Sequence, residues 1–315
     1  MKVFEPCLFE EYYIPQKQID LSSAEQMFLL AACRNDISLI GGIIQENCYV
    51  DTPYKRFEGK DGIEEFVSSF LARFEADTAA VKPYFQTGND TCCVSESVVE
   101  FENSGKIWQV PMFVCADLKE GKLNGIRIYF KYYYLKDLTP YRKPIFRSGT
   151  MELTDPDLFP YPVSEYYMAL HKQGGTDVKK MDELISEDCV YGGYEKDKGR
   201  RYNKKDILSE YRAMADYIPH LVSMKAENVV SNDGVCVMEW THLISDEGRR
   251  RLERPAMAGV AAYQYKDGKL VSIRICDYAG HEKEIDWSET PVSKTEAFQI
   301  NAVTDIEGLR RKDSI

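Results

Sequence analysis

The side chains best suited to proton transfer lie in the second half of this 315-residue sequence. Its four histidines are His171, His220, His242 and His281. Histidine changes its protonation state near neutral pH and is the side chain most often used as a general acid or base. If the chain catalyses proton transfer, the second half therefore holds the catalytic residues.

Sequence signatures of other chemistries are absent. The chain contains no G-x-G-x-x-G, P-loop, H-E-x-x-H, C-x-x-C or G-x-S-x-G motif. The sequence therefore contains none of the motifs that usually indicate a nucleotide cofactor, a zinc site or a serine hydrolase. We expect a protein that needs no cofactor and no metal.

Composition narrows the class further. The formal net charge of −11 would repel a phosphate backbone, so we expect no nucleic-acid partner. The nine cysteines are an odd number without metal-ligand spacing, which indicates a reducing compartment. The sequence has neither a signal-peptide pattern nor an apolar run of membrane-spanning length. We expect a cytoplasmic protein that does not enter a membrane.

The sequence repeats itself at long range. Residues 119–128 and 266–275 agree at seven of ten positions, at a constant offset of 147. Upstream, Asp36 and Cys48 match Asp177 and Cys189 at an offset of 141. Each aspartate precedes a short apolar segment, where an N-cap belongs. Two matches in the same order predict a tandem duplication.

Each copy predicts the same order of elements. In the first copy, Ser22 and Glu25 form a capping box before a helix that ends near Arg34. Further helices are expected at 37–45 and 62–76, and strands at 48–51, 81–87, 91–102, 107–118 and 123–135. In the second copy we expect helices at 164–172, 178–185 and 204–216, and strands at 190–194, 220–230, 235–244, 256–265 and 270–278.

The domain boundaries follow from this order. We expect an N-terminal extension at 1–21, a first domain at 22–136, a proline-rich linker at 137–159, a second domain at 160–283 and a tail at 284–315. The linker contains Pro140, Pro144 and Pro156, which prevent a continuous helix or a central strand.

Several short segments resemble one known family. They are Asn35-Asp36-Ile37, Val50-Asp51-Thr52-Pro53, the Gly-Lys-Asp-Gly-Ile-Glu-Glu-Phe run at 59–66, and the closing Gly-Lys-Leu and Ile-Arg strand. At these residues the sequence resembles the nuclear transport factor 2-like superfamily, and within it the SnoaL-like group of ketosteroid isomerases and polyketide cyclases. The match covers about residues 22–135 and, in weaker form, 160–281.

The resemblance implies the fold and the partners. The fold class would be α+β, with two tandem cone-shaped α+β barrel domains of the cystatin-like kind, in which helices pack on a curved antiparallel sheet around an apolar pocket. Domains of this family usually pair through their sheets, so the two copies would form an intrachain pseudo-dimer, and a homo-oligomer stays open. The fold hosts many activities and does not imply one.

The family's catalytic positions are incomplete in the first copy. Asp51 lies near the position of the isomerase base, whereas Phe28 and Phe113 stand at or near the positions of the two oxyanion donors and cannot donate. Steroid isomerisation is therefore not expected there. An alternative role for Asp51 is an Asx turn before Thr52.

The second copy resembles the dehydratase branch of the superfamily. That branch places a Tyr and an Asp on the first helix and a His at the start of the next long strand. Here Tyr166 and Tyr167 lie on the first helix and His220 opens the strand, but His171 replaces the Asp. Asp277 could supply the missing carboxylate. Both histidines could instead have structural roles. His220 could form a hydrogen bond with the backbone at a strand end, and a cationic His171 near the helix C-terminus could interact favourably with the helix dipole.

The remaining candidates concern a ligand pocket. Along 235–244, Trp240 and His242 share one strand face because side chains alternate. The sequence does not say whether that face lines the interior. We expect Trp240, His242, Tyr191 and Asp51 to line the pocket.

Two functions stay open. The first is a cofactor-independent lyase or isomerase that acts on a small apolar or polycyclic carbonyl compound in the second domain, where His220 removes a proton and a Tyr hydroxyl polarises the carbonyl. The second is a non-catalytic small-molecule-binding or scaffold protein of the same fold.

Overall fold

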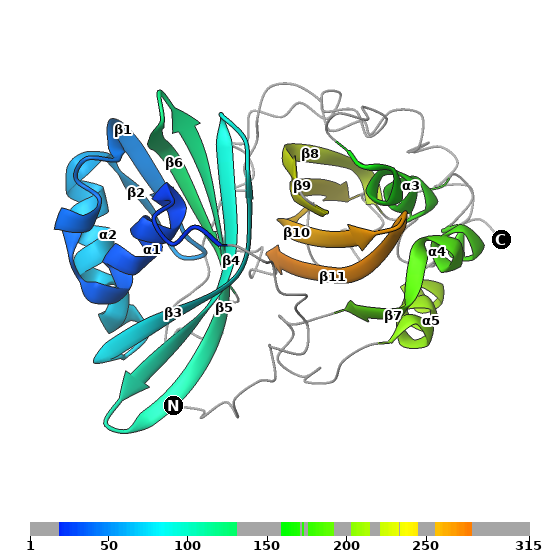
Figure 1. Cartoon of the computed structure of the whole chain (residues 1–315), viewed down its shortest axis with the longest axis horizontal. Helices are drawn as coiled ribbons and strands as arrows, with labels where there is room; N and C mark the ends of the chain where they lie inside the picture. Colours follow the sequence, from blue (N-terminus) through cyan, green and yellow to red (C-terminus); the bar gives the residue numbers. More distant parts are fainter. Residues whose placement is uncertain are drawn as a thin grey trace. The chain divides into compact units, whose positions relative to one another are not determined.

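The computed structural model describes residues 19–130, 159–170, 172, 176–191, 203–214, 221–232, 234–244 and 256–278. The chain divides into two compact units, which we call unit 1 (Met1–Arg142) and unit 2 (Lys143–Ile315) (Figure 1). Each unit is described by itself.

Unit 1 packs helices against one face of a six-stranded sheet (Figure 1). The sheet has the order β2-β1-β6-β5-β4-β3. The elements are α1 (Ala24–Arg34), η2 (Ile37–Leu39), β1 (Ile44–Asp51), β2 (Arg56–Glu58), α2 (Gly59–Arg73), β3 (Thr78–Gly88), β4 (Cys92–Asn103), β5 (Lys106–Lys119) and β6 (Lys122–Tyr129).

Unit 2 has a similar order of elements around a five-stranded sheet, β7-β11-β10-β9-β8; α4 takes the place of η2, and the described residues include no counterpart of β2. The elements are α3 (Tyr161–Leu170), α4 (Val178–Leu184), β7 (Ile185–Tyr191), α5 (Lys204–Met214), β8 (Leu221–Asn232), β9 (Val235–Ile244), β10 (Ala256–Lys266) and β11 (Lys269–Tyr278). The α+β class is thus confirmed.

One feature of both sheets differs from the antiparallel expectation. The first strand of each unit pairs in parallel with the last: β1 with β6, and β7 with β11. The other described pairs are antiparallel. A parallel pair needs a long crossover, and the helix and the antiparallel strands between these partners provide it.

Helix α1 begins differently from the expected capping box. Its N-cap residue is Ser23, whose side chain makes no capping hydrogen bond. Asp20 accepts hydrogen bonds from the backbone N–H of Ser22 at 2.9 Å and from its hydroxyl at 2.6 Å. Ser22 therefore belongs to the preceding turn, and Glu25 is left to turn into the interior, where it is buried.

The expected helix at 37–45 was wrong over most of its length. Only the single 3-10 turn of η2 forms, and the chain then enters β1. Gly41 and Gly42 follow η2 directly, and glycine disfavours helix continuation. The predicted caps are confirmed: Asp36 accepts a hydrogen bond from the backbone N–H of Ser38, and Asp177 accepts one from that of Lys180.

Alternate residues of each sheet face the helices and form the core of that unit. In β5, Val114 and Ala116 belong to the helix-facing core of unit 1. Phe113 and Cys115 point to the other face and are buried as well. In β9, Met238 belongs to the core of unit 2. The helix-facing side of each sheet is therefore the interior in which to look for a site.

Several sequence predictions fall outside the described residues. They include most of the linker at 137–159, the tail at 284–315, and His171, His220 and His281. No helix within the described part of the chain is long and apolar enough to cross a membrane.

The hairpin turns that revealed the repeat have the same backbone geometry in both units. Glu120 and Gly121 have φ angles of 54° and 72°, and Asp267 and Gly268 have φ angles of 51° and 75°. Two consecutive positive φ angles are typical of the tight turn that matches the twist of a hairpin.

Replacing Gly121 by alanine should destabilise unit 1 by about 1–2 kcal/mol, because an alanine there must adopt the left-handed backbone conformation, in which its Cβ is crowded. Urea denaturation measures the difference. Gly41→Ala is the matched control, since a Cβ there meets nothing within 4 Å and its φ is not positive. It should leave stability unchanged or slightly raised. Equal losses in the two variants would contradict the turn assignment.

Candidate active site

Four tyrosines meet in the interior of unit 2. Tyr166 and Tyr167 come from α3, Tyr211 from α5 and Tyr263 from β10. All four are buried, with at most 4% of any residue exposed. The structure therefore brings the two predicted helix tyrosines together with two others that the sequence reading did not single out.

The phenol groups are arranged in two pairs. The hydroxyl of Tyr166 contacts that of Tyr211, and the hydroxyl of Tyr167 contacts that of Tyr263. The ring centroids of the two pairs are 5.9 and 5.6 Å apart, and those of Tyr166 and Tyr263 are 5.7 Å apart. Four hydroxyls thus lie close together in an interior that is otherwise largely apolar.

Unit 1 has no hydroxyl at the positions equivalent to the two helix tyrosines. In unit 1 the N–H of Asp36 donates to Ala31 O at 2.9 Å, and in unit 2 the N–H of Asp177 donates to Ala169 O at 2.8 Å. These bonds align Ala31 with Ala169. Counting back three and two residues along each helix places Phe28 opposite Tyr166 and Leu29 opposite Tyr167.

The other two tyrosines also have apolar equivalents in unit 1. Lys60, Asp61 and Glu65 of α2 match lysine, aspartate and glutamate residues of α5 at one offset, and this offset places Phe66 opposite Tyr211. The shared hairpin register places Ala116 opposite Tyr263. Phe28 and Phe66 stack at 5.4 Å between centroids, where unit 2 has its Tyr166–Tyr211 pair. The hydroxyls are therefore specific to unit 2.

Burial determines what these phenols can do. It raises the pKa of Tyr167, of Tyr211 and of Tyr263 above the ordinary value, because a buried phenolate loses its hydration. The phenols stay protonated at neutral pH. They can donate hydrogen bonds to a carbonyl oxygen or to a developing oxyanion, but they are poor bases.

The residues predicted to line a pocket in unit 2 have different positions. The ring of Tyr191 lies 6.5 Å from that of Tyr211, so it joins the tyrosine group. Trp240 is 6% exposed and belongs to the core cluster together with Cys236 and Met238. This establishes which face of β9 lines the interior. His242 lies on the same strand, but its side chain is outside the described residues.

The same face of β9 carries a thiol. Burial raises the pKa of Cys236 to about 12. The thiol therefore stays protonated at neutral pH and is not a nucleophile in the described state.

The structure does not describe the side chains of the other predicted catalytic residues. His171 and His220 lie outside the described residues. The backbone of Asp277 pairs with Gly259 in the sheet, but its side chain is also outside them. Their roles stay predictions.

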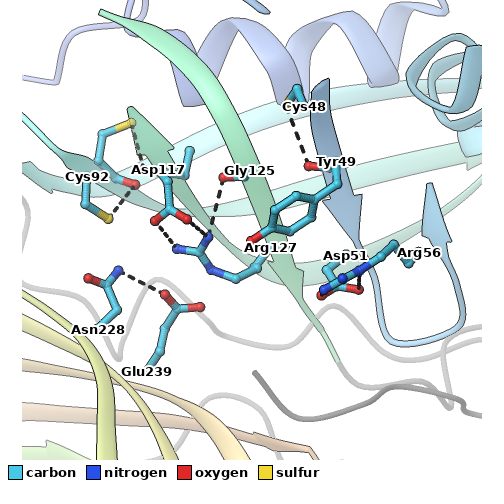
Figure 2. A network of polar contacts seen from close by, with 12 residues as sticks. Cys48, Tyr49, Asp51, Arg56, Cys92, Asp117, Gly125, Arg127, Asn228 and Glu239 are labelled. Carbon is cyan, nitrogen blue, oxygen red and sulfur yellow. Dashed lines mark hydrogen bonds and ion pairs between the residues drawn. The ribbon is translucent and has the colours of Figure 1, made fainter. Parts of the chain in front are cut away.

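Asp51 lies on the opposite face of its strand from the core of unit 1. Cys48 and Val50 belong to that core, and Asp51 alternates with them. Its carboxylate accepts hydrogen bonds from Arg56, with Nη2 at 2.6 Å and Nε at 3.3 Å (Figure 2). The expected Asx turn at Asp51 does not form, because the carboxylate bonds Arg56 instead. The turn after it is made by Thr52, whose hydroxyl donates to Lys55 O at 2.8 Å and accepts from the backbone N–H of Lys55 at 3.0 Å.

A second ion pair lies on β5 and β6. Arg127 is fully buried and donates to Asp117 with both terminal nitrogens, at 2.6 and 2.9 Å (Figure 2). In unit 2, Arg274 donates to Gln264 at 3.0 Å and to Ser272 at 2.5 Å. These contacts order the sheets and add no acid or base to the tyrosine group.

Within the described ranges, no three His, Cys, Asp or Glu side chains gather as a metal site would require.

No protein-family model matches the chain, and neither does any curated protein. Solved structures resemble about a third of it. TerC crystallised with polyporic acid is 15% identical over 35% of this chain and 94% of its own, with a TM-score of 0.31. A candidate SnoaL-like polyketide cyclase from Jannaschia sp. CCS1 is 12% identical over 37% and 93%, with a TM-score of 0.28.

A nuclear transport factor 2-like protein of unknown function from Cytophaga hutchinsonii is 14% identical over 35% of this chain and 100% of its own, with a TM-score of 0.29. Likeness at this level says nothing about activity.

The tyrosine pairs predict a pattern of stabilities. Tyr166→Phe leaves the buried hydroxyl of Tyr211 without its partner and should cost about 1–3 kcal/mol. The double variant Tyr166→Phe/Tyr211→Phe recreates the Phe28–Phe66 arrangement of unit 1 and should cost less than either single change. Urea denaturation of the wild type, Tyr166→Phe, Tyr211→Phe and the double variant gives the interaction energy between the two hydroxyls. Additive losses would show that the two hydroxyls do not depend on each other.

Proposed function

We propose that unit 2 is a cofactor-independent lyase or isomerase that acts on a small apolar or polycyclic carbonyl compound. The observation that carries the proposal is the group of four buried tyrosine hydroxyls at positions where unit 1 has Phe28, Leu29, Phe66 and Ala116. Burying a hydroxyl costs free energy unless it is hydrogen-bonded. Phe and Leu fill the equivalent interior of unit 1, so packing alone does not require tyrosine hydroxyls in unit 2.

The proposed reaction starts at a carbon next to the carbonyl group. His220 removes a proton from that carbon, and the electron pair moves onto the carbonyl oxygen. A tyrosine hydroxyl donates a hydrogen bond to the resulting enolate oxygen, which stabilises its charge in a water-poor interior. The protonated His220 then either returns its proton to another carbon of the enolate, which is isomerisation, or gives it to a leaving group that the enolate expels from the β-carbon, which is elimination.

The phenols fit the donor role and not the role of base. Since burial raises the pKa of Tyr167, Tyr211 and Tyr263, each remains protonated when the enolate forms. A separate base is therefore needed, and His220 is the residue that we assign to it from the sequence. Asp277 is the residue proposed to orient it, because His171, which stands where the dehydratases have an Asp, cannot supply a carboxylate. Tyr191, Trp240 and His242 would line the substrate side.

The alternative is a non-catalytic binder. The phenols bond to one another in pairs, which is also how a filled interior satisfies buried hydroxyls. In that case unit 2 would hold a passive ligand or none, and no proton would move.

We also propose that the two units arose by duplication of one domain. Their shared element order, the parallel closing pair of each sheet and the equal hairpin turns support this origin. The pairing of the units as an intrachain pseudo-dimer, and a homo-oligomer, stay predictions from the resemblance.

Proton exchange tests the enzyme directly and does not require the product to be known. Carbonyl compounds that raise the melting temperature are first selected, because a ligand that binds the native state stabilises it. Each is then incubated with the protein in D2O, and loss of the α-proton signal is followed by NMR. The wild type should exchange the α-proton, and His220→Asn should not. Tyr166→Phe/Tyr211→Phe should exchange about 100-fold more slowly, since loss of an oxyanion donor costs about that much.

The control is Tyr54→Phe, which removes a buried hydroxyl from a half-buried tyrosine of unit 1. It should exchange at the wild-type rate. Exchange that survives both the His220→Asn and the Tyr166→Phe/Tyr211→Phe changes would overturn the proposal. Binding without exchange for every selected ligand would favour the passive binder.

A further inference from the structure

Unit 1 contains a buried carboxylate that the proposed function does not use. Glu25 lies in the first turn of α1 and is 1% exposed. Its Oε1 accepts a hydrogen bond from the hydroxyl of Ser23 at 2.8 Å and another from the side-chain amide of Gln86. The carboxylate is therefore held in place on one side.

The helix-facing side of β3 and β4 presents polar side chains to this carboxylate. Ser95 pairs directly with Gln86 across the two strands, and Cys93 and Ser97 are its neighbours on the same face of β4. The amide of Gln26 donates to the hydroxyl of Ser97 at 3.3 Å. A polar group thus occupies one end of an interior that elsewhere consists of aromatic and aliphatic side chains.

Cys93 reports how close these groups lie to Glu25. Its thiol has a raised pKa, first because it is buried and then because of the charge of Glu25 and a hydrogen bond with it. Gln86 and Cys93 both reach Glu25, and Ser95 is adjacent to both on the sheet. The hydroxyl of Ser95 therefore lies on the sheet face that Glu25 contacts.

Two buried oxygens of this polar group have no hydrogen-bond partner among the described residues. They are Oε2 of Glu25 and the hydroxyl oxygen of Ser95. The described contacts of Glu25 include no Lys, Arg or His side chain. An unpaired buried carboxylate oxygen destabilises the fold, so a donor that reaches these two oxygens, and above all a cationic one, would bind favourably.

The fold does not require this group. The alignment that places Phe28 opposite Tyr166 places Glu25 opposite Val163, and the register of the hairpins places Ser95 and Ser97 opposite Met238 and Trp240. All three residues of unit 2 are buried in its core. The same architecture thus closes with apolar side chains, and unit 1 has a polar group there for another reason.

We propose that Glu25, Ser95 and their polar neighbours form a binding site in unit 1 for the ammonium group of a small primary amine. One N–H donates to Oε2 of Glu25 and a second donates to the hydroxyl of Ser95. The positive charge compensates the buried carboxylate. The site is separate from the tyrosine group of unit 2, so each can fail without the other.

Methylammonium is the probe, because it is the smallest primary alkylammonium ion. Methylammonium chloride should raise the melting temperature of the full chain by a few degrees in a saturable manner, relative to sodium chloride at the same ionic strength. Tetramethylammonium, which has the charge but no N–H group, should have no such effect. Equal shifts with both cations, or no shift with methylammonium, would overturn the proposal.

Two variants locate the effect. Glu25→Gln keeps the shape of the side chain but removes its charge, and it should abolish the shift. Ser95→Ala removes one acceptor and should weaken apparent binding about tenfold, as expected for one lost hydrogen bond of about 1.4 kcal/mol. A full methylammonium shift in Glu25→Gln would show that the cation binds elsewhere.

Discussion

The interior of each unit is closed by a helix on a curved sheet, and this closure constrains everything placed inside it. A buried polar group has no water to bond with, so it must find a partner in the protein or in a ligand, or it destabilises the fold. Unit 1 meets this constraint over most of its core by using aromatic side chains, of which Phe28 and Phe66 stack with nearly parallel rings. Unit 2 meets it by pairing hydroxyls, as between Tyr166 and Tyr211.

The two units are therefore alike in architecture and opposite in the position of their polar groups. In unit 2 the hydroxyls lie deep against α3 and α5, whereas the first turn of α3 is apolar at Val163. In unit 1 the deep positions are apolar and the first turn of α1 carries Glu25. Each unit thus keeps one group that packing alone does not explain, and the two groups suit different ligands: neutral hydroxyl donors suit a carbonyl oxygen, and a carboxylate suits a cation.

This division changes the role of unit 1. Its lack of histidine and its Phe28 suggest a domain that has lost chemistry and only supports its neighbour. The buried carboxylate makes its interior chemically distinct from that of unit 2. The strands β1 and β7, which pair in parallel with the last strand of each sheet, close both interiors in the same way, so the difference between the units depends on side chains and not on topology.

Much of the fold could be predicted from particular residues. The Gly-Lys turn after Glu120 and after Asp267 located the closing hairpins, and Asp36 and Asp177 located two helix caps, because these features depend on a few adjacent residues. The expected helix at 37–45 ends early at Gly41 and Gly42, a local signal, and its last two residues belong to β1, whose parallel pairing with β6 is a contact between distant segments. The same holds for the start of α1, where Asp20 takes Ser22 out of the cap.

The candidate site divides in a similar way. The sequence alone pointed to Tyr166 and Tyr167, because they stand on the first helix of a copy that contains the histidines. A careful alignment of the two copies could also have found Tyr211 opposite Phe66 and Tyr263 opposite Ala116. It could not show that these four phenols meet, that Trp240 faces the interior, or that Asp51 points away from it and bonds to Arg56.

The sequence by itself therefore determined the α+β class, the repeated order of elements and the types of residue available for chemistry. The tertiary structure alone decided which of those residues share an interior. The reason is physical: turns and caps are set by local backbone preferences, whereas the partner of a buried hydroxyl or carboxylate is chosen by packing between segments that are far apart in the chain.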